Sequence, residues 1–144
     1  MKLKLDQDWM TDDFFDGTRL IGIVASMKDY QLCWHLNQLL NFDFRNNTEI
    51  EIQLKKKTRS YYFSVFQYNE PNSALGHYLY NNQFDGEYLL PEFKHLDFLW
   101  LLKGDYVSNK QMEDYMESLK NLNGIQLATE LTIEKIRHKG HLIF

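Results

Sequence analysis

The stretch "DFLWLLKGDYVSNKQMEDYMESLKNLNGIQLATEL", residues 97–131, decides the fold. It begins with an apolar run, 97–103, that is dense enough to be a central strand covered on both faces. Ser108 and Gln111 follow in the spacing of a capping box, which predicts a helix. The apolar residues of that helix recur at helical spacing: Met112, Tyr115, Met116, Leu119 and Leu122. An Asn-Gly pair then ends the helix, and alternating residues predict a closing strand at 125–131.

The N-terminal half predicts the same strand-helix-strand unit. "RLIGIVA", residues 19–25, is an apolar run of strand length. Residues 26–29 have the form of a capping box, so we expect a helix over about 27–40. "TEIEIQLK", residues 48–55, alternates strictly between apolar and polar side chains, which indicates a half-buried strand.

The segment between the two units predicts additional strands. The aromatic run 60–68 is expected to pair with 48–55 as a hairpin, through the basic loop Lys55–Arg59. That loop is interpreted as a solvated turn and not as a phosphate-binding patch. Short strands are expected at 77–80 and 87–90.

These elements predict one α+β domain over residues 1–144. Two strand-helix-strand units that share a sheet indicate a ferredoxin-like, ACT-like sandwich. The sheet should be mostly antiparallel, with an inserted hairpin and with both helices on one face. Residues 1–17 are expected to be an irregular lead-in and 132–144 a short tail.

Composition limits the possible functions. The net charge of −4 opposes non-specific binding to nucleic acid. Cys33 is the only cysteine, so an internal disulfide and a CxxC motif are both excluded. No segment has the form of a signal peptide or approaches membrane-spanning length, which favours a cytoplasmic protein.

The segment "LPEFKHLDF", residues 90–98, concentrates charged groups ahead of the central strand. Glu92 and Asp97 could act as a general acid and base, which requires two carboxyl groups at a defined separation in one pocket. The alternative, which we favour, is structural: Pro91 starts one helical turn, Glu92 lies near its N-terminal end, and Asp97 terminates it.

This segment resembles the IPExxxVDY signature of a family of small uncharacterised bacterial proteins. Pro91, Glu92 and Asp97 match the signature, whereas Leu90, Leu96 and Phe98 replace its Ile, Val and Tyr. "SMKDYQLCWHLNQLL" and the C-terminal "LIF" are also similar to the family. The resemblance implies a cytoplasmic protein encoded near ribonuclease III, fatty-acid condensing enzymes and pyruvate kinase, and it implies no activity.

No pattern supports an enzyme, a metal site or a cofactor. The histidines are scattered, and only His138 and His141 lie close together in the sequence. Cys33 lies on the apolar stripe of its helix and is interpreted as a small buried residue and not as a nucleophile. Glycine patterns for dinucleotides and phosphates are absent, as is GxSxG.

Two surfaces could contact a partner or a ligand. The turn Lys103, Gly104 and Asp105 could present backbone N–H groups to a small anion, by analogy with ACT domains that bind amino acids. On the first predicted helix, Trp34 points away from the apolar stripe, close to Tyr30 and Asn37.

On this side of the helix, the Trp34 side chain needs another segment to bury it. Either the lead-in with Trp9, Phe14 and Phe15, or the tail, folds over it, or a partner chain does. We favour cover from the same chain, because it has spare aromatic segments; an uncovered Trp34 would be the best contact anchor in the sequence.

The sequence therefore predicts a non-enzymatic interaction or regulatory module that could self-associate. The alternatives are an ACT-like sensor of amino acids or nucleotides and a ribonuclease-associated RNA-binding protein, although the acidic charge balance opposes the latter.

Overall fold

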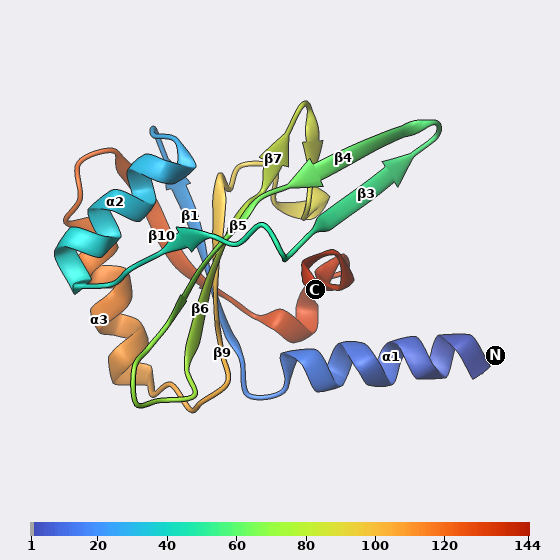
Figure 1. Ribbon diagram of the computed structural model, residues 1–144, viewed down its shortest axis with the longest axis horizontal. Coiled ribbons are helices and arrows are strands. Elements are labelled where there is room, and N and C mark those ends of the chain that lie inside the picture. The colour runs from blue at the N-terminus through green and yellow to red at the C-terminus, as the bar shows by residue number, and fades with distance from the viewer. Residues whose placement is uncertain (1) are drawn as a thin grey trace.

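The computed structural model describes residues 2–144, with side chains described from Trp9 onward. Its centre is a six-stranded sheet in the order β10-β1-β9-β6-β5-β2, in which all neighbouring strands are antiparallel (Figure 1). The strands of this sheet are β1 (Arg19–Ala25), β2 (Arg45–Asn46), β5 (Val65–Asn69), β6 (Gly76–Asn81), β9 (Phe98–Lys103) and β10 (Ile125–Leu131). The α+β class and the mostly antiparallel sheet are confirmed.

Two small ribbons and three α-helices complete the fold. The ribbons are β3 (Ile52–Lys56) with β4 (Arg59–Phe63), and β7 (Gln83–Phe84) with β8 (Glu87–Tyr88). The helices are α1 (Lys2–Phe15), α2 (Asp29–Leu40) and α3 (Asn109–Lys120). Single 3₁₀ turns lie at Pro91–Phe93, Ile133–Lys135 and Lys139–Leu142.

One face of the sheet is covered by α2 and α3. Side chains from both helices share a single buried cluster with every second residue of the central strands, because successive strand residues point to opposite faces. The strand residues in this cluster include Ile21, Ile23, Leu79, Phe98, Trp100 and Leu102, and the helices contribute Leu32, Cys33, Leu36, Met112 and Leu119.

The opposite face of the sheet is also covered, so the molecule has three layers. Leu20, Tyr80, Leu99 and Leu101 pack there against the 89–96 segment, the base of the β3–β4 hairpin and the C-terminal tail. The tail is fixed by a hydrogen bond in which the Tyr80 hydroxyl donates to the Leu142 carbonyl at 2.8 Å. The expected tail is therefore a packed layer of the core.

The prediction of an irregular lead-in is wrong. Residues 2–15 form α1, which extends away from the body of the domain (Figure 1). The C-terminal end of α1 is anchored to the domain: Phe15 is buried, and the Thr18 hydroxyl donates to the Phe15 carbonyl at 2.8 Å. The apolar residues of α1 follow no helical period in the sequence, which is why the helix was not predicted.

The two capping predictions have different outcomes. Ser108 caps α3 as expected, accepting the Gln111 backbone N–H at 3.1 Å while the Gln111 side chain accepts the Ser108 N–H at 2.9 Å. At α2 the predicted cap is wrong, because the helix starts at Asp29 and the Gln31 side chain accepts the Lys28 N–H. Ser26 instead continues β1, donating its N–H to the Gly124 carbonyl.

The aromatic run 60–68 is not one strand. It is split at Ser64 into β4, which pairs with β3, and β5, which joins the central sheet. The first half pairs with β3 in the predicted hairpin, and the turn lies in the predicted basic loop, whereas the second half belongs to a different sheet. Because aromatic residues lie on both sides of Ser64, the sequence pattern does not show where one strand ends and the next begins.

Within residues 2–144, no helix combines the length and the apolar character needed to cross a bilayer.

Candidate functional site

The 90–98 segment forms a structural junction on the tail-covered face of the sheet. Pro91–Phe93 is a single helical turn, as predicted. Leu90 and Leu96 on either side of it are fully buried. The Leu96 methyls lie directly over Gly22 in β1, where an added Cβ would approach Leu96 Cδ1 to 2.6 Å. The leucines of the segment therefore fix this turn onto the central sheet, and Gly22 provides the space.

A fully buried asparagine holds the junction together. Asn82 Oδ1 accepts the Leu90 N–H at 2.8 Å, and Nδ2 donates to the carbonyls of Phe93 and Leu96, both at 2.9 Å. These bonds satisfy the backbone at both ends of the helical turn. The sequence does not single out Asn82, because nothing in the local pattern distinguishes it from a surface asparagine.

Asp97 closes the ladder at the end of β1. Its carboxylate accepts the Ala25 N–H at 2.9 Å, and its own N–H donates to the Ile23 carbonyl at 2.8 Å. Its carbonyl accepts the Asn82 N–H at 3.0 Å. Asp97 thus replaces the backbone partners that β1 lacks where β9 begins.

Glu92 holds the C-terminal tail. One carboxylate oxygen accepts the His138 N–H at 3.0 Å, and the other lies 3.0 Å from the His138 ring Nδ1. Partial burial favours the neutral acid, but hydrogen bonds from the backbone N–H groups of Glu92 and His138 and from the His138 ring outweigh it and lower the pKa of Glu92. The ionised form of Glu92 is therefore favoured by its contacts with the tail.

These two acids serve different segments of the chain. Glu92 binds the tail and Asp97 binds the end of β1, so each carboxylate already has backbone N–H partners. A general acid and base pair needs both carboxyl groups directed at one reacting atom. The geometry supports a structural role for both acids, but the expected role of Asp97 is wrong in detail: Lys94 is the C-cap of the turn, and the Asp97 carboxylate binds β1. The buried Phe98 that follows packs in the helix-covered core.

The Gly104 turn packs against a neighbouring loop. Gly104 has φ +111°, and an added Cβ would lie 2.2 Å from the Ala74 carbonyl oxygen. Asp105 accepts the Tyr106 N–H, while Lys103 Nζ donates to the Phe14 carbonyl at the end of α1. The space directly over Gly104 is thus occupied by protein, which weakens the case for an anion site at this turn.

Trp34 is not covered by its own chain, so the expected intramolecular cover is wrong. Its side chain is 59% exposed and that of Tyr30 is 58% exposed, on the face of α2 that points away from the sheet. Asn37, the third predicted contact residue, is used internally: its amide accepts the Phe44 N–H at 2.8 Å and donates to the Phe44 carbonyl. We define the outer face of α2 as Tyr30, Trp34, Gln38 and Leu39, all of them exposed.

A chain of hydrogen bonds, which the sequence did not indicate, runs from the half-buried Glu70 into the helix-covered core. His77 is fully buried, with Nε2 2.9 Å from a Glu70 carboxylate oxygen. Trp100 Nε1 donates to His77 Nδ1 at 3.1 Å. Burial lowers the pKa of His77, although the bond to Glu70 partly opposes this. Because both ring nitrogens are engaged, His77 has no free atom for acid-base chemistry and acts as a structural residue.

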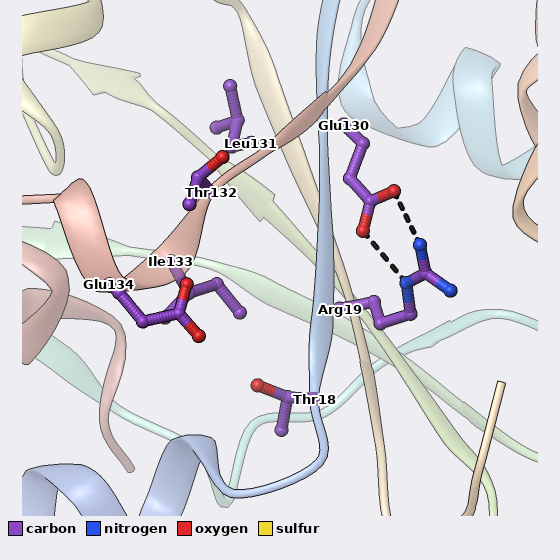
Figure 2. Close-up of a pocket in the computed structure, with 7 residues that line it drawn as sticks. All are labelled: Thr18, Arg19, Glu130, Leu131, Thr132, Ile133 and Glu134. Carbon is purple, nitrogen blue, oxygen red and sulfur yellow. Dashed lines mark hydrogen bonds and ion pairs between the residues drawn. The ribbon is translucent and has the colours of Figure 1, made fainter. Parts of the chain in front are cut away.

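A small polar pocket of about 380 Å³ lies where β1 begins and β10 ends (Figure 2). Figure 2 shows Arg19 facing Glu130, which it binds through Nε at 2.8 Å and through a terminal nitrogen at 2.7 Å. The other terminal nitrogen of Arg19 donates to the Val107 carbonyl at 3.0 Å. The guanidinium is therefore committed to the protein and leaves this pocket without a free cation for an anionic ligand.

The remaining candidate groups have structural partners or are shielded. Burial and the nearby Asp29 raise the pKa of Cys33 to about 12, so the thiolate is disfavoured. In the basic loop, Lys56 pairs with Glu87 and Arg59 pairs with Asp85. Residues 9–144 contain no group of three or more His, Cys, Asp or Glu side chains arranged to hold a metal ion.

Comparison with known proteins does not assign the chain. No protein-family model matches the sequence, and no curated protein is similar at a significant level. The resemblance of residues 90–98 to the IPExxxVDY signature remains a prediction.

Proposed function

We propose that this protein is a non-enzymatic interaction module that self-associates through the outer face of α2. The observation that carries the proposal is the exposure of Trp34, at 59%, on a helix whose opposite face is packed in the core. Tryptophan and tyrosine contribute more to interface energies than most other residues, and large exposed aromatic groups are costly to leave in water.

The pattern of the outer face suits pairing with a second copy. Tyr30, Trp34 and Gln38 are spaced by four residues and form one uncharged stripe along α2. In a two-fold antiparallel contact, Trp34 lies near the axis and Tyr30 meets Gln38 of the other copy. No like charges along this stripe would oppose one another.

This contact is expected to be weak. A single helix stripe is smaller than the roughly 800 Å² per partner that stable interfaces bury. We therefore expect a monomer-dimer equilibrium that depends on concentration, in keeping with a regulatory role.

We also propose a more specific fold within the α+β class. We infer a ferredoxin-like arrangement from β1, α2, β6, β9, α3 and β10, which follow the order β-α-β-β-α-β along the chain. In the sheet, β9 lies between β1 and β6, and β1 lies between β9 and β10. The segment from β2 to β5 is then an insertion. By the resemblance described above, we also propose a bacterial cytoplasmic setting.

Sedimentation velocity over a concentration series tests the proposed function. We expect the wild-type sedimentation coefficient to rise with concentration and that of Trp34→Ala to stay at the monomer value. Tyr106→Ala is the matched control, because Tyr106 is 80% exposed but lies outside the α2 face. A wild-type protein that stays monomeric throughout, or a Trp34→Ala variant that associates as strongly as wild type, would exclude this function.

A further inference from the structure

A groove lies between α1 and the C-terminal tail. It has a volume of about 1020 Å³. Its apolar side chains come from two segments that are far apart in the sequence: Trp9, Met10 and Phe14 of α1, and Ile143 and Phe144 of the tail. Neither the proposed self-association nor the 90–98 junction uses this groove.

The apolar walls of the groove are unusually open to water. Trp9 is 68% exposed, Met10 59% and Phe144 42%. Phe14 and Phe144, which both line the groove, meet edge to face with ring centroids 5.2 Å apart. A ligand lying along the groove would therefore remove a substantial apolar surface from water, which is favourable in proportion to the area covered.

Among residues 9–144, the side chains that line the groove carry an excess of positive charge. Lys103, Arg137 and Lys139 line it, and Asp13 is the acidic residue among the lining side chains. Lys103 Nζ already donates a hydrogen bond to the Phe14 carbonyl, and it lies 4.3 Å from the centroid of the Phe14 ring. Among residues 9–144, Arg137 and Lys139 have no ion-pair partner, in contrast to Arg19 and Arg59.

We propose that this groove binds a small anionic amphiphile, a molecule with an apolar chain or ring and one carboxylate or phosphate group. The apolar part would lie between α1 and the tail, and the anionic group would pair with Arg137 and Lys139. An uncharged apolar ligand would leave these cations unpaired, and a simple inorganic anion would leave Trp9 and Met10 in water. The combination of features thus selects a ligand with both parts.

Calorimetric titration with matched ten-carbon probes tests the head-group requirement. Decanoate, decyl phosphate and decanol are titrated into the full chain below the concentrations at which they form micelles. We expect one or both anions to bind and decanol to bind much more weakly; the stronger anion identifies the head group. Failure of both anions to bind, or equal binding of decanol, would overturn the proposal.

A charge-removal variant places the site. Arg137→Gln/Lys139→Gln should weaken binding of the better anion by about tenfold or more, because charge-assisted bonds to the head group are lost. Lys55→Gln/Lys57→Gln is the control, since it removes the same net charge from two exposed lysines at the tip of the β3–β4 hairpin, one in β3 and one in the turn. If both variants weakened binding equally, the loss would come from the change in net charge alone. That result would contradict binding of the head group by Arg137 and Lys139.

The fluorescence of Trp9 gives an independent readout. In a Trp34→Phe background, Trp9 is the exposed tryptophan and Trp100 is buried. Binding in the groove should shift the emission to shorter wavelength, and the shift should disappear in Trp9→Phe/Trp34→Phe. Binding detected by calorimetry without this shift would place the probe elsewhere and refute the groove. Because Trp34 is replaced, this result does not depend on self-association.

Discussion

At the scale of single residues, Asn82 is the most constrained polar group of the 90–98 junction. We predict that Asn82→Ala lowers the free energy of unfolding by roughly 1–3 kcal/mol for each buried partner left without a hydrogen bond. The Phe93 carbonyl is only partly buried and can recover a hydrogen bond from water, so the loss is expected to be below the full sum. Urea denaturation measures this difference.

The control for Asn82 is the residue before it. Asn81 is half-buried and donates one side-chain hydrogen bond, to Asp29 at 2.9 Å. Asn81→Ala should therefore cost much less than Asn82→Ala. Equal effects of the two substitutions would show that the buried amide does not organise the turn.

His77 predicts how stability depends on pH. Because burial lowers the pKa of His77 in the native protein, the unfolded chain takes up a proton near pH 6.5 while the native protein does not. Unfolding then binds a proton, so this contribution makes stability fall as the pH falls below about 6.5 and towards the native pKa. Urea denaturation at pH 7.5 and 5.5 should show this decrease in the wild type.

Replacing the His77 ring separates its contribution to the pH dependence of stability from those of other groups. His77→Phe lowers stability at both pH values, because Trp100 Nε1 loses its acceptor, but it should reduce the difference between them. An unchanged pH difference in His77→Phe would contradict a neutral His77 in the native state.

At the scale of elements, the C-terminal tail is predicted to be part of the core. Leu142 is fully buried and lies in the cluster with Leu90 and Leu96. Leu142→Ala should lower the free energy of unfolding by about 2–5 kcal/mol, the range for large-to-small changes in a core. Leu127→Ala, in which the residue is 40% exposed on β10, should cost far less. A small effect at Leu142, measured by urea denaturation, would mean that the tail merely rests on the surface.

The elements that sequence analysis located are those with strong local patterns. The apolar run 19–25 and the alternating run 125–131 match β1 and β10 residue for residue. The Ser108 cap and helical spacing located α3 because both depend on neighbours in the chain. In contrast, α1 has no clear apolar stripe, and the break at Ser64 depends on which sheet each half joins. Such long-range pairing leaves no local pattern.

The candidate site was predictable to a similar degree. The residues at 90–98 were identified, and Pro91 starts a turn as expected. The roles of Glu92 and Asp97 depend on His138 and Ala25, which are distant in sequence and therefore invisible to pattern analysis. The same holds for Asn82 and for the Glu70, His77 and Trp100 chain. The groove beside α1 required both ends of the chain to be placed in space.

At the scale of the whole molecule, the three-layer packing explains why α2 becomes the candidate contact surface. The tail and the 89–96 segment cover one face of the sheet, and α2 and α3 cover the other. With α1 extending away from the body, neither terminal segment covers Trp34 (Figure 1). In the function proposed above, a second molecule covers this residue, and the uncharged stripe around it favours a second copy.

The most direct test of this claim is nuclear magnetic resonance of the tryptophan indole N–H signals during dilution. The chain has one tryptophan in each relevant place: Trp9 on α1, Trp34 on α2 and Trp100 in the core. The account predicts that the Trp34 signal moves with protein concentration while those of Trp9 and Trp100 stay fixed. A Trp34 signal that does not change from micromolar to millimolar protein would contradict self-association through α2.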